Sequence, residues 1–260
     1  MNSDGGVAGA STSLTVGESA IWNGGDVAHS SNWSDGTNWV SGLAPGFGNH
    51  VVFAGITGLA PVLDSAYSIA SLTFSNNAGA FVLTNSGGSV LTVAGGVTNN
   101  SANVQTLNLP VALGGAVTLN TASNNFVFEG AISGSGSLNA VGAGVSTLMA
   151  ANSYTGNTTI SAGCTLAIAD PSQLGSGSYA GNITDNGVLN WNSSLAQELS
   201  GVLSGFGALN LTGSAVLTLS GASGLYSGPI NISGGSAEVV LGGDLSAVGQ
   251  NGSGSGLVTL

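Results

Sequence analysis

The sequence predicts an all-β protein whose strands coil into a β-solenoid, and three observations predict it. Short alternating or β-branched apolar runs recur along the chain, each bounded by Gly, Asn or Ser. No long helical periodicity interrupts them, and the 45 glycines fall every few residues, which is costly within a helix. The third observation is an internal repeat, because a strand-and-turn unit that cannot bury its own face is stabilised by stacking on its neighbour.

The internal repeat is longer than one coil. The run from Ser133 to Asn139 aligns with the run from Ser204 to Asn210 at an offset of 71 residues, and Tyr154 aligns with Tyr226 at an offset of 72. Strands recur at shorter spacing within each copy, so we expect one copy to hold several coils. With roughly 20 to 25 residues per coil, the chain makes on the order of ten coils. The clearest expected strands are residues 71–74, 90–93, 117–119, 165–168 and 216–219.

Turn residues support tight corners between these strands. Glycine permits backbone conformations that other residues avoid. Asn139, Asn157 and Asn210 stand at recurring positions, where we expect turns, and asparagine tolerates left-handed conformations and can stack in ladders.

Composition excludes several classes of function. The 260 residues contain no Lys or Arg, and the formal net charge is −11. Nucleic-acid binding depends on basic residues that neutralise phosphates, so we expect no nucleic-acid partner. The chain is 42% hydrophobic with a mean hydropathy of +0.40, which is enough to bury a core. A surface with so few charges repels copies of itself weakly, which favours self-association, and it offers trypsin no cleavage site.

Part of the chain resembles a known repeat family. The run from Ala131 to Leu138, the segment from Asn152 to Gly163 and Leu166 resemble the autotransporter-associated beta strand repeat, and residues 201–240 resemble a more diverged member. A Lys usually follows the Gly-Ser-Leu segment in that family, whereas this chain has Asn139 or Ala140 there. The apolar positions are kept. The resemblance implies a right-handed parallel β-solenoid (β-helix) from large exported bacterial surface proteins, an extracellular or cell-surface location, and no enzymatic activity.

The same resemblance extends to the N-terminal part and suggests four regions. Residues 1–19 form an N-terminal arm, and residues 20–55 form a Trp-rich capping segment like the one that commonly precedes such repeats. Residues 56–250 form the solenoid, with repeat copies at about 128–170 and 199–241, and residues 251–260 form a C-terminal linker and strand.

Aromatic residues crowd into the capping segment. Trp22, Trp33, Trp39 and Phe47 fit an aromatic-rich N-terminal cap that seals the first coil, and the alternative is a platform that stacks on sugars. His29 and His50 lie nearby, but no spacing suited to three or four metal ligands occurs, so we expect surface residues and no metal site.

Catalytic groups are sparse as well. The acidic residues are isolated in sequence, and a serine nucleophile would need a poised base that two histidines hardly supply. We therefore expect no catalytic residues and no cofactor. Cys164 is the single cysteine, so no intramolecular disulfide can form, and we expect a small buried side chain beside Leu166 and Ile168. The N-terminus lacks the basic start and apolar run of a signal peptide, and no stretch is long and apolar enough for a membrane-spanning helix.

These features favour a structural subunit of an extracellular bacterial fibre or surface layer, in which solenoids stack head to tail as a homopolymer. The candidate assembly strands lie near the two ends, at Leu14, Thr15 and Val16 and at Leu257, Val258, Thr259 and Leu260. The alternative is an adhesin or polysaccharide-binding surface module that uses the Trp-rich region. Neither hypothesis involves membrane insertion.

Overall fold

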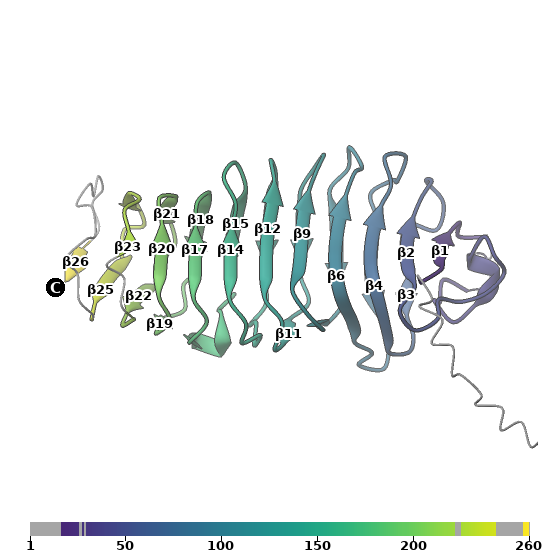
Figure 1. Cartoon of the computed structure of the whole chain (residues 1–260), viewed down its shortest axis with the longest axis horizontal. Helices are drawn as coiled ribbons and strands as arrows, with labels where there is room; N and C mark the ends of the chain where they lie inside the picture. The colour runs from purple at the N-terminus through teal and green to yellow at the C-terminus, as the bar shows by residue number, and fades with distance from the viewer. Residues whose placement is uncertain (1–16, 26–27, 29, 222–224, 243–256, 260) are drawn as a thin grey trace, which may run out of the picture.

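Three parallel β-sheets wind around one apolar core in a computed structural model of the chain, which describes residues 17–25, 28, 30–221, 225–242 and 257–259. They form a β-solenoid of about nine turns, close to the expected number of coils. Successive strands lie side by side along one long axis, from β1 at the N-terminal end to β26 at the C-terminal end (Figure 1). The predicted all-β parallel solenoid is therefore confirmed.

The largest sheet has twelve strands, and most of them form what we call the first face. Its strands are β1 (Ser19–Trp22), β2 (His50–Phe53), β4 (Tyr67–Phe74), β6 (Leu91–Asn99), β8 (Val111–Leu113), β9 (Val117–Thr121), β11 (Ile132–Gly134), β12 (Leu138–Gly142), β14 (Thr158–Ile160), β17 (Ile183–Asp185), β20 (Leu203–Gly205) and β23 (Leu225–Tyr226).

The nine-stranded sheet forms the second face. Its strands are β3 (Val62–Leu63), β5 (Val82–Asn85), β7 (Gln105–Asn108), β10 (Phe126–Phe128), β13 (Val145–Leu148), β15 (Thr165–Ala169), β18 (Val188–Asn192), β21 (Ala208–Leu211) and β24 (Ile230–Ile232).

The third face has two parts. In the early coils it consists of β8, β11 and the first halves of β4 and β6, which bend around a corner to reach the first face. In the later coils it is a five-stranded sheet of β16 (Ser178–Tyr179), β19 (Gln197–Leu199), β22 (Val216–Leu219), β25 (Glu238–Leu241) and β26 (Leu257–Thr259). Two short 3₁₀ helices, η1 (Gly36–Asn38) and η2 (Gly175–Gly177), complete the elements.

Alternation along each strand builds the core. Strands such as β9 and β14 bury every second residue, as a sheet with one face in the core requires. The inward residues stack in register from coil to coil: on the first face Leu72, Val97, Leu119, Ala140 and Ile160 form one continuous column. Cys164, Leu166 and Ile168 are all fully buried, which confirms the prediction for the single cysteine.

Two of the three predicted asparagine positions differ from the prediction, while Asn157 lies at the corner before β14. Asn139 and Asn210 lie within strands β12 and β21 rather than in turns, and among the described residues the only non-glycine residue with a positive φ is Ser176. Asn210 does form a ladder: its Nδ2 donates to Asn190 Oδ1 and its Oδ1 accepts from Asn231 Nδ2, both at 2.8 Å. Stacked amides satisfy one another between coils, so a strand position serves an asparagine ladder as well as a turn does.

Candidate functional site

The N-terminal end of the first face is covered by the chain itself. Strand β1 pairs with β2 on one side, and on the other side the segment around Trp39 runs antiparallel to it. The Val40 N–H donates to Ile21 O and the Asn23 N–H donates to Asn38 O, both at 2.9 Å. The first edge strand therefore offers few free backbone groups to another chain.

The other two faces are covered at the same end. Residues 31–33 run beside β3, where the Trp33 N–H donates to Val62 O at 2.9 Å and the Val62 N–H donates to Ser31 O at 2.8 Å. On the third face the Gly48 N–H donates to Ser68 O, at 2.9 Å. Residues 30–49, which we call the cap, thus cover the edge of every face at the N-terminal end.

Indole rings hold the cap in place. Trp22, Trp33 and Trp39 are at most 1% exposed, and Trp39 meets both other indoles edge to face at centroid distances of 5.1 and 5.5 Å. The Trp39 Nε1–H donates to Trp33 O at 2.8 Å, and the Trp22 Nε1–H donates to Gly58 O at 3.0 Å. Because their faces are buried, these rings cannot stack on a sugar.

Phe47, which we expected among them, lies elsewhere. It is 91% exposed, in a turn between Gly46 and Gly48. The aromatic that packs against the three indoles is Phe53, on the inward side of β2, with ring centroids 5.6 to 6.2 Å away. His50 is half-buried, and its Nδ1 lies 2.7 Å from Ser71 Oγ; His29 lies outside the described residues.

The C-terminal end is built differently. Strand β26 runs parallel to β25, with Leu257, Val258 and Thr259 opposite Glu238, Val239 and Val240. It is the last strand in the order of the five-stranded sheet, and within the described part of the chain it pairs on one side only. Three of the four predicted C-terminal assembly residues therefore form a strand of the chain's own solenoid. Leu260 and the N-terminal candidates Leu14, Thr15 and Val16 lie outside the described residues.

Acidic side chains join neighbouring coils instead of forming a catalytic pair. Asp64 accepts hydrogen bonds from Ser34, Asp170 from Ser194, and Glu198 from Ser178 and Ser220, partners that lie 20 to 30 residues away in sequence. Among the described residues, no group of three or more His, Cys, Asp or Glu side chains could hold a metal ion. Nor does that part of the chain include a helix suited to crossing a membrane.

One acid is buried in the core. Asp185 continues the inward column of the first face directly after Ile160 and is fully buried. Its Oδ1 accepts from the Gly187 N–H at 3.0 Å and its Oδ2 accepts from the Tyr226 hydroxyl at 3.3 Å. Burial raises the pKa of this carboxyl to about 6. The alternation of Ile183, Thr184 and Asp185 places Asp185 on the inward side of β17. This alternation is visible in the sequence and could have identified the buried acid.

One protein family resembles two segments of this chain. The passenger-associated-transport-repeat family matches residues 138–168 and residues 209–236, which include β12 to β15 and β22 to β24. No curated protein and no solved structure matches the chain.

Proposed function

The chain carries passenger-associated-transport repeats on a parallel β-solenoid, the architecture of an autotransporter passenger domain, and we propose that it is a structural subunit of an extracellular fibre or surface layer. The repeat itself implies a secreted or surface-exposed protein. In this proposal the solenoids join end to end, without catalysis.

The contrast between the two ends is the observation that carries the proposal. The cap covers the N-terminal edge of each face, whereas β26 is paired on one side only among the described strands. Along the lateral faces, most described strands already bond to the coils above and below; β16, which pairs with β19 alone, is an exception. The unpaired edge of β26 is therefore where another strand can add main-chain hydrogen bonds.

The cap also limits how two copies can join. A flush contact between the first coil of one copy and the last coil of another would meet an edge that is already hydrogen-bonded. Residues 13–16, Ser-Leu-Thr-Val, have the alternation of a strand and are the donor that we propose for β26 of the next copy.

The nearly uncharged surface favours such pairing. Natural proteins protect sheet edges with charged side chains, especially Lys. This chain has no Lys, and only 11 of its 260 residues are Asp or Glu. Each Leu or Val that a joint fully covers contributes about 1.5–3 kcal/mol, which offsets the ordering of a short strand.

Truncation tests the joint. Removal of residues 257–260 should leave a folded, soluble solenoid that forms no fibres in electron micrographs, because the acceptor strand is lost. Removal of residues 1–16 should do the same, because the donor is lost. The matched control removes residues 1–10 alone and should still assemble, since it keeps the donor strand.

Far-UV circular dichroism and light scattering of each variant separate loss of assembly from loss of folding. Fibres formed by both long truncations would mean that the contacts are lateral. A full chain that stays monomeric at every concentration and pH would refute the proposed function itself.

The adhesin alternative loses its expected site. Of its four aromatic residues, Trp22 in β1 and Trp33 and Trp39 in the cap are buried, and only Phe47 presents its ring to solvent. Binding to a polysaccharide would therefore need a different surface.

A further inference from the structure

The third face is interrupted at one place. Residues 153–155 extend its early part, because the Ser153 N–H donates to Ile132 O at 2.8 Å and the Thr155 N–H donates to Gly134 O at 3.0 Å. The next strand of this face, β16, begins a separate sheet and pairs, within the described part of the chain, with β19 alone. The two coils are still bonded beside the interruption, where the Ser176 N–H donates to Asn152 O at 2.9 Å. The gap is confined to the space between residues 153–155 and residues 178–180.

The interruption coincides with a long coil. The register on the first face places Thr158 opposite Leu138, 20 residues on, but places Ile183 opposite Thr158, 25 residues on. Part of the additional length forms η2, where Ser176 has a φ of 54° between two glycines that also have positive φ. A non-glycine residue held in this region is strained, and such strain concentrates at functional sites.

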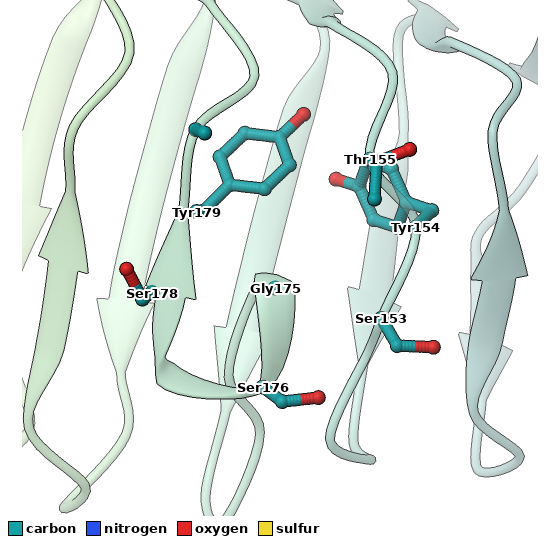
Figure 2. Close-up of a pocket in the computed structure, with 8 residues that line it drawn as sticks. Ser153, Tyr154, Thr155, Gly175, Ser176, Ser178 and Tyr179 are labelled. Carbon is teal, nitrogen blue, oxygen red and sulfur yellow. The ribbon is translucent and has the colours of Figure 1, made fainter.

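The gap is a pocket. Its volume is about 230 Å³, and it is lined by residues 153–155 on one side and by Gly175, Ser176 and residues 178–180 on the other. Figure 2 shows Tyr154 and Tyr179 beside each other, with Ser153 and Ser176 below them. The two rings pack edge to face at a centroid distance of 5.4 Å and form the floor of the pocket. Ser153, Thr155, Ser176 and Ser178 are exposed, so their hydroxyl groups form a polar rim.

A buried hydroxyl network fixes the floor. Thr158 Oγ1 lies 2.8 Å from the hydroxyl of Tyr154 and 2.8 Å from that of Tyr179, and the Tyr179 hydroxyl donates to Gly156 O. Both rings are at most 1% exposed. Burial raises the pKa of each tyrosine, which keeps both hydroxyls protonated and uncharged.

The chemistry of the rim limits what can bind. No Lys or Arg is available to hold an anion, and the acid that reaches the rim, Glu198, accepts a hydrogen bond from Ser178 at 3.3 Å. Hydroxyl groups donate and accept, so they suit a neutral ligand that also does both. A pocket smaller than the roughly 300 Å³ typical of drug-sized ligands has room for one small ring.

We propose that this pocket binds a single neutral sugar residue, which hydrogen-bonds to the hydroxyls of Ser153, Thr155 and Ser176. The site lies on the side of the solenoid and does not depend on end-to-end assembly. Because the tyrosine rings are buried, no aromatic face stacks on the sugar, and we expect a dissociation constant on the order of 1 mM.

Titration followed by NMR tests this proposal on the full chain. Neutral methyl glycosides of glucose, galactose and mannose are added to isotopically labelled protein, with glucuronate as the charged comparison. We expect at least one neutral glycoside to shift the amide signals of residues 153–155 and 175–180, and glucuronate to bind more weakly because the chain has a net charge of −11.

Substitutions at the rim supply the second readout. Thr155→Val and Ser153→Ala each remove a hydroxyl from an exposed side chain and should weaken binding about five-fold. Ser133→Ala is the matched control, since Ser133 lies one coil earlier on the same face, outside the pocket, and should leave binding unchanged.

Three results would overturn the proposal. One is the absence of any shift with every glycoside at concentrations up to about 100 mM, far above the expected dissociation constant. Another is binding that the rim variants leave intact. The third is tighter binding, at the same residues, of an extended peptide such as Leu-Val-Thr-Leu, which would make the interruption a strand-addition site instead.

Discussion

An acidic residue in this chain must be satisfied without a basic side chain, and the structure shows two solutions. Exposed carboxylates accept hydrogen bonds from serines on neighbouring coils, and the bonds from Ser194 lower the pKa of Asp170. Asp185 instead occupies a core column between apolar coils, where its partners are the Gly187 N–H and the Tyr226 hydroxyl. The second solution links stability to pH.

Asp185 should make the folded chain less stable as pH rises from about 4 to 6. The unfolded carboxyl has a pKa of about 3.9, whereas burial raises it to about 6 in the folded chain. Between these values the folded state holds a proton that the unfolded state has released, so the neutral carboxyl's stabilising contribution is complete at low pH and is lost as pH rises. The loss is about 3 kcal/mol at most.

Asp185→Asn should abolish this part of the pH dependence. The amide keeps the shape of the side chain and cannot ionise, so the variant should exceed the original chain in stability above about pH 6. Urea unfolding of both proteins across this range measures the difference. Parallel pH profiles for the two proteins would show that Asp185 is not the group responsible.

At the scale of elements, glycine columns let the coils approach closely at their corners. Glycines 115, 136, 156, 181, 201 and 221 follow one another, one per coil, at the corner that leads to the first face. A Cβ added to any of the last five would lie 1.9 to 2.5 Å from the carbonyl oxygen of the glycine in the coil before. No real side chain fits at that distance, so these positions need glycine because of close approach.

Gly201→Ala should therefore destabilise the solenoid strongly. Its Cβ would lie 2.2 Å from Gly181 O, and backbone shifts of this kind cost about 1–3 kcal/mol or more. Gly235→Ala is the matched control, because an added Cβ there meets nothing within 4 Å. Urea unfolding should separate the two variants, and equal stabilities would show that the corners can widen at little cost.

The repeat copies occupy different faces, which the sequence offset alone did not reveal. Leu138 begins β12 on the first face, whereas its counterpart Leu209 lies in β21 on the second face. Likewise Leu148 lies on the second face and Leu219 on the third. Three coils take the chain from Leu138 to Leu203, at the equivalent position of the first face. The counterpart of Leu138 in the repeat, Leu209, lies six residues after Leu203 and therefore past the next corner. The corners are similar enough for one motif to serve at each.

At the scale of the whole molecule, the described part of the solenoid has a capped N-terminal edge, whereas β26 is paired on one side only among the described strands. The cap keeps β1, β3 and the start of β4 from pairing with another chain. Its stability comes from the buried indoles and from backbone bonds, without a single Lys or Arg in the chain.

Opening the cap should therefore expose an edge that can pair with another chain. Trp33→Ala together with Trp39→Ala removes two fully buried indoles, and a single Trp→Ala change in a core costs about 3–5 kcal/mol. We expect hydrogen exchange to rise in β1 and β3 while the later coils keep their protection, and light scattering to report association that persists without residues 1–16. Unchanged exchange in β1 would show that the indoles are not what holds the cap.

The sequence by itself determined the fold class, the coil length and the buried cysteine. Alternation, glycine frequency and the repeat can all be read along the chain, because they depend only on the order of residue types. For the same reason the sequence indicated that tryptophans gather near the first coil.

Tertiary structure decided what the corners and ends do. Three features depend on the lengths of the coils, which separate paired residues by 20 to 25 positions. They are the pairing of Asp185 with Ile160, the shift of the repeat by one face and the pocket beside Ser176. A sequence pattern shows which side of a strand a residue occupies. Only the register between coils shows which residues of other coils it meets.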